Sequence, residues 1–154
     1  MRGRSLLIAV LVGGLVAGAL DITFALSFAA YNGTPPQRLL QIVASGLLGK
    51  AALAGGLPVA ALGLALHFIM SLLWAAGFMA LALWRPLLAR HPVAAGIGFG
   101  VTVFLVMRLV VLPLSAFPFP VSFKPLATVL DLMSHTLLFG VPIALAARRA
   151  WVRA

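Results

Sequence analysis

Four long apolar segments, separated by short polar stretches, dominate the pattern of the chain. They cover residues 5–31, 57–84, 93–116 and 126–147. A helix that crosses the hydrocarbon core of a bilayer, about 30 Å thick, needs about 20 mostly apolar residues. The stretches between the segments, NGTPPQR, RPLLARHP and FPFPVSFKP, contain Pro, Gly or Asn, which interrupt helices. The pattern therefore predicts four transmembrane helices.

A shorter segment over residues 37–50, between the first two spans, also has helical periodicity. Apolar positions such as Leu39 and Val43 repeat one turn apart, whereas Gln41 and Ser45 lie on another face. The segment is too short and too polar for a confident span. We interpret it as an interfacial or re-entrant helix, with a half-buried loop helix as the alternative.

Composition agrees with a membrane protein. Of the 154 residues, 64% are hydrophobic and 8% are charged, whereas a typical soluble domain has about 25% charged residues. The chain has no cysteine, which excludes disulfides, thiolate metal sites and cysteine nucleophiles. We therefore predict an all-α fold in one transmembrane domain over residues 1–154, an integral membrane four-helix bundle with the short helix between helices 1 and 2. The first apolar run is too long for the core of a signal peptide, which favours an uncleaved span.

The net charge of +9 would be typical of a protein that binds nucleic acid. The basic residues, however, lie at the ends of the apolar segments, as in membrane proteins. The expected partner is therefore the lipid bilayer and not nucleic acid. Further copies of the chain, in a homo-oligomer, or another membrane protein are the other expected partners. The positive-inside rule predicts a multi-pass membrane protein with both termini in the cytoplasm. The side of the termini carries Arg2, Arg4, Arg85, Arg90, Arg148, Arg149 and Arg153, and the other side carries Arg38, Lys50 and Lys124.

Two short motifs occur twice. LGLALH in the second span and LDLMSH in the fourth both fit Leu-x-Leu-x-x-His. The first span contains Gly14 and Gly18, and the third contains Gly96 and Gly100, in each case as Gly-x-x-x-Gly. This motif lets helix backbones approach closely in lipid. The repetition suggests a duplicated two-helix hairpin whose copies have the same orientation.

The ionisable residues inside the four spans form a small set. A rise of about 1.5 Å per residue places all of them in one layer, near or just outside the midplane. An Asp or Arg near a helix centre costs roughly 2.5–3.5 kcal/mol on insertion scales, so the charges are expected to meet. Arg108 can pair with Asp21 or Asp131, and Asp131 can orient a histidine one turn away. The set, which we predict to be an intramembrane polar site, is Asp21, His67, Arg108, Asp131 and His135.

The charges of this layer do not balance, because two aspartates face one arginine. A protonated histidine, a protonated aspartate or a bound cation would supply the missing positive charge. The leading hypothesis is a transport- or permeation-related membrane protein with a proton-linked site. In the alternative, the protein is a non-catalytic scaffold or accessory subunit whose polar layer is structural.

A second alternative is an electron carrier in which His67 and His135 ligate a haem. No phosphate loop, glycine-flanked serine nucleophile or tight metal-ligand spacing is present in the sequence. The sequence therefore predicts neither an enzyme nor a cofactor- or metal-binding protein.

Two runs, LHFIMSLLW through VLPLSAFP and LDLMSH through AARR, resemble the YagU-like family of small bacterial inner-membrane proteins. The matching features are His67, the pair Gly96 and Gly100, Pro113 followed by leucine, and His135. They cover about the last two-thirds of the chain. The resemblance implies four helices in a bacterial inner membrane and no particular mechanism.

Overall fold

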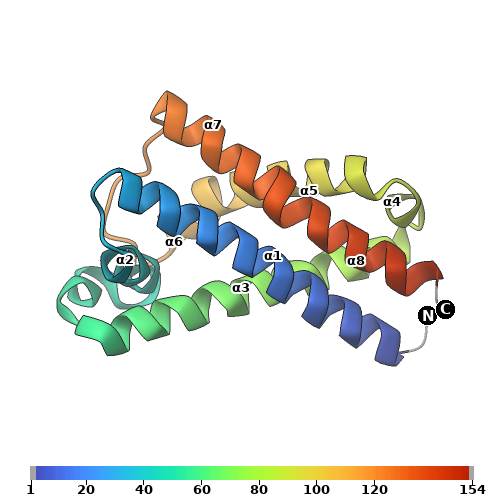
Figure 1. Cartoon of the computed structure of the whole chain (residues 1–154), viewed down its shortest axis with the longest axis horizontal. Coiled ribbons are helices and arrows are strands. Elements are labelled where there is room, and N and C mark those ends of the chain that lie inside the picture. The colour runs from blue at the N-terminus through green and yellow to red at the C-terminus, as the bar shows by residue number, and fades with distance from the viewer. Residues whose placement is uncertain (1–2, 153–154) are drawn as a thin grey trace.

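The computed structural model describes residues 3–152 and is built from helices (Figure 1). Four of its helical segments are long and apolar enough to cross a membrane, which confirms the prediction. They are α1 (Gly3–Tyr31), α3 (Gly56–Trp84), the segment Pro92–Leu114 and the segment Pro125–Val152. Arg2 and Arg153, which the charge argument used, lie outside the described residues.

The third and fourth spans are each divided into three parts by a short π-helix. The third contains α5 (Pro92–Val106), the π-helix η2 (Met107–Val111) and α6 (Leu112–Leu114). The fourth contains α7 (Pro125–Met133), the π-helix η3 (Ser134–Gly140) and α8 (Val141–Val152). The fourth span thus ends at Val152 rather than at the predicted residue 147, because its last residues include alanine and arginine, which favour helix.

The long helices run side by side along the molecule, and the start of α1 lies at the same end as the end of α8 (Figure 1). Helix α1 packs against α3 on one side and against η3 and α8 on the other, while α5 packs against η3 and α8. At the end of the termini lies the short helix α4 (Leu87–Arg90). The opposite end holds α2 and the connection over residues 115–124.

The predicted helix between the first two spans is present as α2 (Pro36–Leu48), followed by the 3₁₀ helix η1 (Gly49–Ala54). Gln41 and Ser45 are buried, whereas the side chain of Leu47 is 60% exposed. Ala44 is buried as well, and Gln37 and Arg38 are exposed, so apolar and polar residues occur on both sides of the helix.

The duplicated hairpin predicted from the sequence has matching contacts. A Cβ atom on Gly14 would lie 3.1 Å from the Cα of Leu72, and one on Gly96 would lie 2.8 Å from the carbonyl oxygen of Gly140. One turn further along, Gly18 packs against Phe68, as Gly100 packs against Thr136. Between the two hairpins, both glycines are shifted by 82 residues and both of their partners by 68 residues, which supports the duplication.

The apolar core lies in the half of the bundle next to the termini. Its largest fully buried side chains include Phe78, Met79, Val103 and Ile143. Many large apolar side chains of the long helices, such as Leu73 at 61% exposure, point outward, which suits a surface in contact with lipid. Asp21, Arg108, Asp131 and His135 lie in the other half, toward α2.

We expect reporters to show both termini on the cytoplasmic side. A C-terminal fusion of green fluorescent protein should fluoresce, and a C-terminal alkaline phosphatase should be inactive, because the terminus-side loops carry most of the arginines. A phosphatase inserted within residues 115–124 should be active and serves as the control. An active C-terminal phosphatase would contradict this orientation.

Candidate functional site

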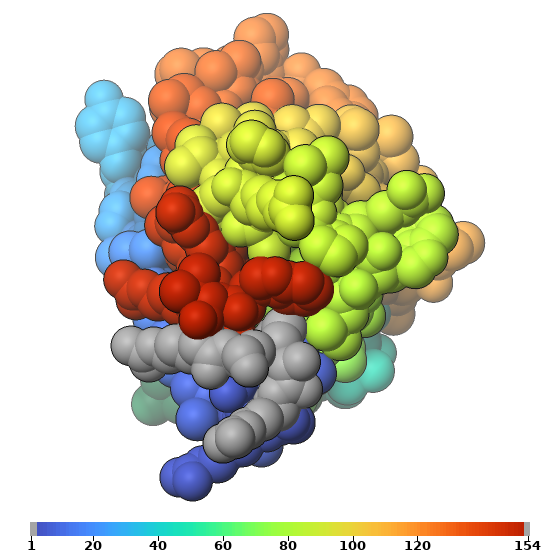
Figure 2. Space-filling model, turned by 90° about the vertical axis from the view of Figure 1, so that its right-hand side faces the viewer, coloured from blue at the N-terminus to red at the C-terminus, as the bar shows by residue number. Residues whose placement is uncertain are grey.

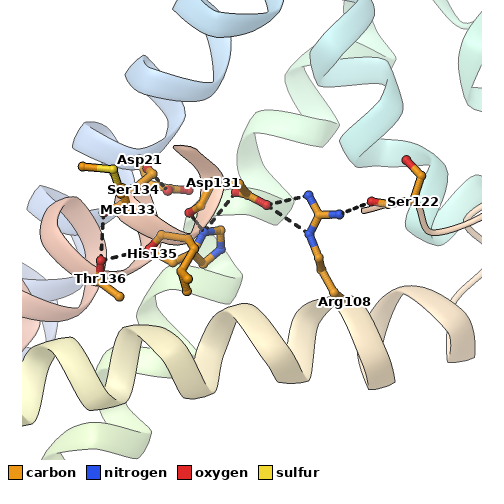
Figure 3. A network of polar contacts seen from close by, with 9 residues as sticks. Asp21, Arg108, Ser122, Asp131, Met133, Ser134, His135 and Thr136 are labelled. Atoms are coloured by element: carbon orange, nitrogen blue, oxygen red, sulfur yellow. Dashed lines mark hydrogen bonds and ion pairs between the residues drawn. The ribbon is translucent and has the colours of Figure 1, made fainter. Parts of the chain in front are cut away.

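Arg108 and Asp131 form an ion pair that joins the third and fourth spans (Figure 3). The guanidinium of Arg108, on η2, donates from Nε and Nη2 to the same carboxylate oxygen of Asp131, at 3.1 and 2.8 Å. Its Nη1 donates to the carbonyl oxygen of Ser122 at 2.6 Å. The side chains of Arg108 and Asp131 remain 20% and 33% exposed. The pair thus fixes both spans and the loop between them, and part of it is accessible.

His135 uses the other oxygen of the same carboxylate. Its Nδ1 lies 3.1 Å from Oδ1 of Asp131 and 2.9 Å from the carbonyl oxygen of that residue, one helical turn away. Both contacts require a proton on Nδ1, so Nε2 carries a second proton only in the charged form of the ring. Within residues 3–152, Nε2 makes no hydrogen bond. Asp131 is therefore shared between a permanent cation and a group that can gain or lose a proton.

Asp21 reaches the same region through a serine. The buried Ser134 donates from Oγ to Oδ1 of Asp21, on α1, at 2.7 Å. Because Ser134 precedes His135 directly, Asp21 lies next to the network without pairing with Arg108. The sequence left the partner of Arg108 open between Asp21 and Asp131, and the structure pairs it with Asp131.

His67 is separated from this network. Its Nε2 donates to the carbonyl oxygen of Gly18 at 2.9 Å, and its ring meets the edge of Phe68. One turn along α3, Ser71 similarly donates to the carbonyl oxygen of Gly14 at 2.6 Å. These bonds tie α3 to α1 where the glycines bring the two backbones close. The structure thus connects four of the five sequence-predicted site residues and gives His67 a bond between helices.

Both π-helices of the described residues coincide with the network. Segment η2 contains Arg108, and η3 begins with Ser134 and His135. Pro113 and Pro142 follow the two segments, and each proline lacks the N–H that would bond to the carbonyl four residues earlier. The wider turns of a π-helix change the direction in which its side chains point, and short π-helices are common at functional sites.

A half-open cavity of about 370 Å³ lies beside the network, under the connection over residues 115–124. The rings of Phe104 and Phe123 lie 5.3 and 5.4 Å from the guanidinium carbon of Arg108, within the range of cation–π attraction. The cavity is lined by Phe104, Met107, Arg108, Leu112, Phe117, Pro120, Val121, Ser122, Lys124, Ala127, Asp131 and His135.

The geometry bears on the metal and haem alternatives. Within the described part of the chain, no group of three or more His, Cys, Asp or Glu side chains is placed to hold a metal ion. His67 does not line the cavity beside His135, and its Nε2 is already bonded to Gly18. A bis-histidine haem site would therefore require the two helices to move.

Sequence reasoning missed three residues of the site, because it assigned no role to Ser122 or Ser134 and used Lys124 only in the count of basic residues. The carbonyl group of Ser122 carries no signal in sequence. Ser134 could have been found from its position beside His135, and Lys124 from its position directly before the first turn of the fourth span.

The fold and this network together define a small polytopic membrane protein in contact with the lipid bilayer. Comparisons with protein-family models, curated proteins and solved structures gave no match to the chain. The resemblance to the YagU-like family stays a prediction.

Proposed function

We propose that this protein carries a small organic anion across a bacterial inner membrane together with a proton, and that it is not an enzyme. The observation that carries the proposal is the cavity of about 370 Å³, which is lined by Arg108, Asp131 and His135 inside the membrane-spanning bundle. Ionisable residues at such positions commonly mark substrate or proton pathways. A cavity of this volume is in the range of small-molecule sites.

The charges around the cavity favour an anion. Both acidic residues of the chain already have partners, since Asp131, in the cavity wall, pairs with Arg108, and Asp21 accepts from Ser134. Lys124 lines the same cavity and has no carboxylate partner among residues 3–152. An entering carboxylate would gain a partner in Lys124 and would lie beside the guanidinium.

The shared carboxylate provides the link to a proton. Asp131 divides its two oxygens between Arg108 and His135. An anion that bound Arg108 would weaken the hold of this arginine on Asp131, and a proton on His135 would then replace the lost positive partner. Anion and proton thus stabilise each other in the cavity, which is the thermodynamic basis of coupled movement.

On the side of the termini, the path is closed by the apolar core. Phe78, Met79 and Val103 are almost completely buried there. Transport would therefore require a second state in which the helices separate at this end, as in alternating access.

Proton movement in sealed proteoliposomes tests the proposal. Vesicles containing a pH-sensitive dye should acidify inside when lactate or gluconate is added outside, and should not respond to glucose or choline. Asp131→Asn should abolish the acidification, because the neutral amide holds neither Arg108 nor a charged His135 in the same way. Lys124→Gln should reduce it.

The matched control is Lys50→Gln, which removes an exposed lysine at the same end of the molecule but outside the cavity. It should leave the rate unchanged. Acidification that is equal in the wild type, in Asp131→Asn and in protein-free vesicles would contradict the proposal.

A further inference from the structure

A second hollow lies on the outer surface of the bundle, away from the polar network. It is a groove of about 400 Å³ between α1 and the fourth span. Small residues form its floor, and larger apolar side chains that are about half exposed, such as Ile8 and Val12, form its rim. The groove is lined by Ser5, Ile8, Ala9, Val12, Gly13, Val16, Pro142, Leu145, Ala146, Arg149 and Ala150.

The length of the groove corresponds to one leaflet of a bilayer. It follows α1 from Ser5 to Val16, which is about 16 Å at the rise of an α-helix. Half of the hydrocarbon core of a membrane is about 15 Å thick. At the floor of the groove Gly13 brings α1 close to the fourth span, since a Cβ atom on the glycine would lie 3.0 Å from the Cβ of Ala146. A volume of about 400 Å³ over this length is too small to enclose a helix about 10 Å wide, and it suits one acyl chain.

The polar end of the groove is basic. Arg149 lines it, opposite Ser5, at the end of the molecule where the termini lie. Figure 2 shows this end, with the start of α1 in blue and the end of α8 in red beside α4. Both acidic residues of the chain belong to the polar network in the other half. A ligand of the groove would therefore meet apolar walls first and then, at the membrane surface, a guanidinium that pairs with no carboxylate among residues 3–152.

We propose that this groove binds one anionic phospholipid from the leaflet on the side of the termini. An acyl chain lies between α1 and α8, and the phosphate of the headgroup is bound by Arg149. Arginine suits this role because its planar donors match the geometry of a phosphate group. A second copy of the chain fits less well, since a two-fold contact along this groove would bring Arg149 and the neighbouring arginines together with their own counterparts. The site is independent of the function proposed for the inner cavity.

Lipid binding to the purified protein tests the inference. Phosphatidylglycerol and phosphatidylcholine with identical acyl chains are added to the protein in detergent, and native mass spectrometry counts the lipids that stay bound. The wild type should retain one phosphatidylglycerol about fivefold more tightly than phosphatidylcholine, as expected for one arginine at a membrane surface. Arg149→Gln should remove this preference and leave phosphatidylcholine binding unchanged.

Two further variants separate the groove from general surface charge. Arg90→Gln removes an exposed arginine at the same end that does not line the groove, and it should change nothing. Val12→Trp, at an exposed position on the rim, should obstruct the groove and weaken the retention of both lipids. Equal retention of the two lipids by the wild type, an equal effect of Arg90→Gln and Arg149→Gln, or a dimer that Val12→Trp dissociates would each overturn the inference.

Discussion

Replacing Arg108 with alanine is expected to lower the free energy of unfolding by about 2–4 kcal/mol. The change leaves the carboxylate of Asp131 without the two N–H donors that now bind it at 3.1 and 2.8 Å. The loss should be smaller than for a fully buried ion pair, because the side chain of Asp131 is 33% exposed and water can replace part of the interaction. Thermal or denaturant unfolding in detergent measures the effect.

The double change Arg108→Leu with Asp131→Leu should recover most of this loss, because it removes both charges together. The matched control is Arg108→Leu with Asp21→Leu. This control should recover nothing, since Asp21 is bonded to Ser134 and not to the arginine. If the control were rescued and the Asp131 double variant were not, the pairing described above would be wrong.

The same double variant distinguishes the transport hypothesis from a purely structural role. Buried ion pairs in some proteins serve only to fix the register of helices. A scaffold whose polar layer is structural should keep its function once the stability is restored. On the proposed function, the rescued protein folds but no longer couples anion entry to acidification, because neither Arg108 nor Asp131 is present.

The second large effect is expected at Gly100, where α5 touches the fourth span. A Cβ atom there would lie 2.5 Å from the Cα of Thr136 and would also meet the carbonyl oxygen of His135. Gly100→Ala therefore forces two backbones apart, and we expect a loss of about 2–3 kcal/mol in the free energy of unfolding. The displaced segment carries His135, so proton-linked activity should also fall in the fraction that folds.

Gly98 supplies the control for this substitution, because it lies in the same helix and a Cβ atom on it would meet nothing within 4 Å. Gly98→Ala should be neutral or stabilising by up to about 1 kcal/mol, since alanine favours helix. If the two alanine variants had equal stability, the close approach of α5 and η3 would be contradicted.

Sequence reasoning recovered the elements of the fold well, and for a physical reason. The length of an apolar segment is set by the thickness of the bilayer, and it can be counted along the chain without knowledge of the neighbours. The close contacts of Gly14 and Gly96 could likewise be anticipated, because only a glycine lets backbones approach so near. The ends of spans were less predictable, since the fourth helix continues through Arg148 and Arg149 beyond its apolar part.

The partners within the polar layer were harder to predict, because depth can be counted along a helix but rotation about its axis cannot. His67 and His135 have similar estimated depths, yet His67 faces α1 and His135 faces the cavity. The π-helices alter the rotation further, and their only signal in the sequence was Pro113 and Pro142. The connection over residues 115–124 is held by tertiary contacts, such as the bond from the Ala116 N–H to the Gly46 carbonyl at 2.9 Å. Such tertiary contacts leave no local pattern in the sequence from which they could be predicted.

The proposed function requires that water and solutes reach the charged site inside the membrane-spanning bundle. Because the chain has no cysteine, single cysteines can be labelled without background. Met107→Cys places a thiol in the wall of the cavity, and Leu109→Cys places one on the 57% exposed outer face of the same segment. A thiol reacts as its thiolate, which forms in water and not in hydrocarbon.

A membrane-impermeant maleimide added from the side of residues 115–124 therefore measures access directly, with Ser122→Cys in that loop as the positive control. We expect Met107→Cys and Ser122→Cys to be labelled and Leu109→Cys to stay unmodified. Labelling of Ser122→Cys alone, with Met107→Cys as unreactive as Leu109→Cys, would contradict a water-accessible site and the function proposed for it.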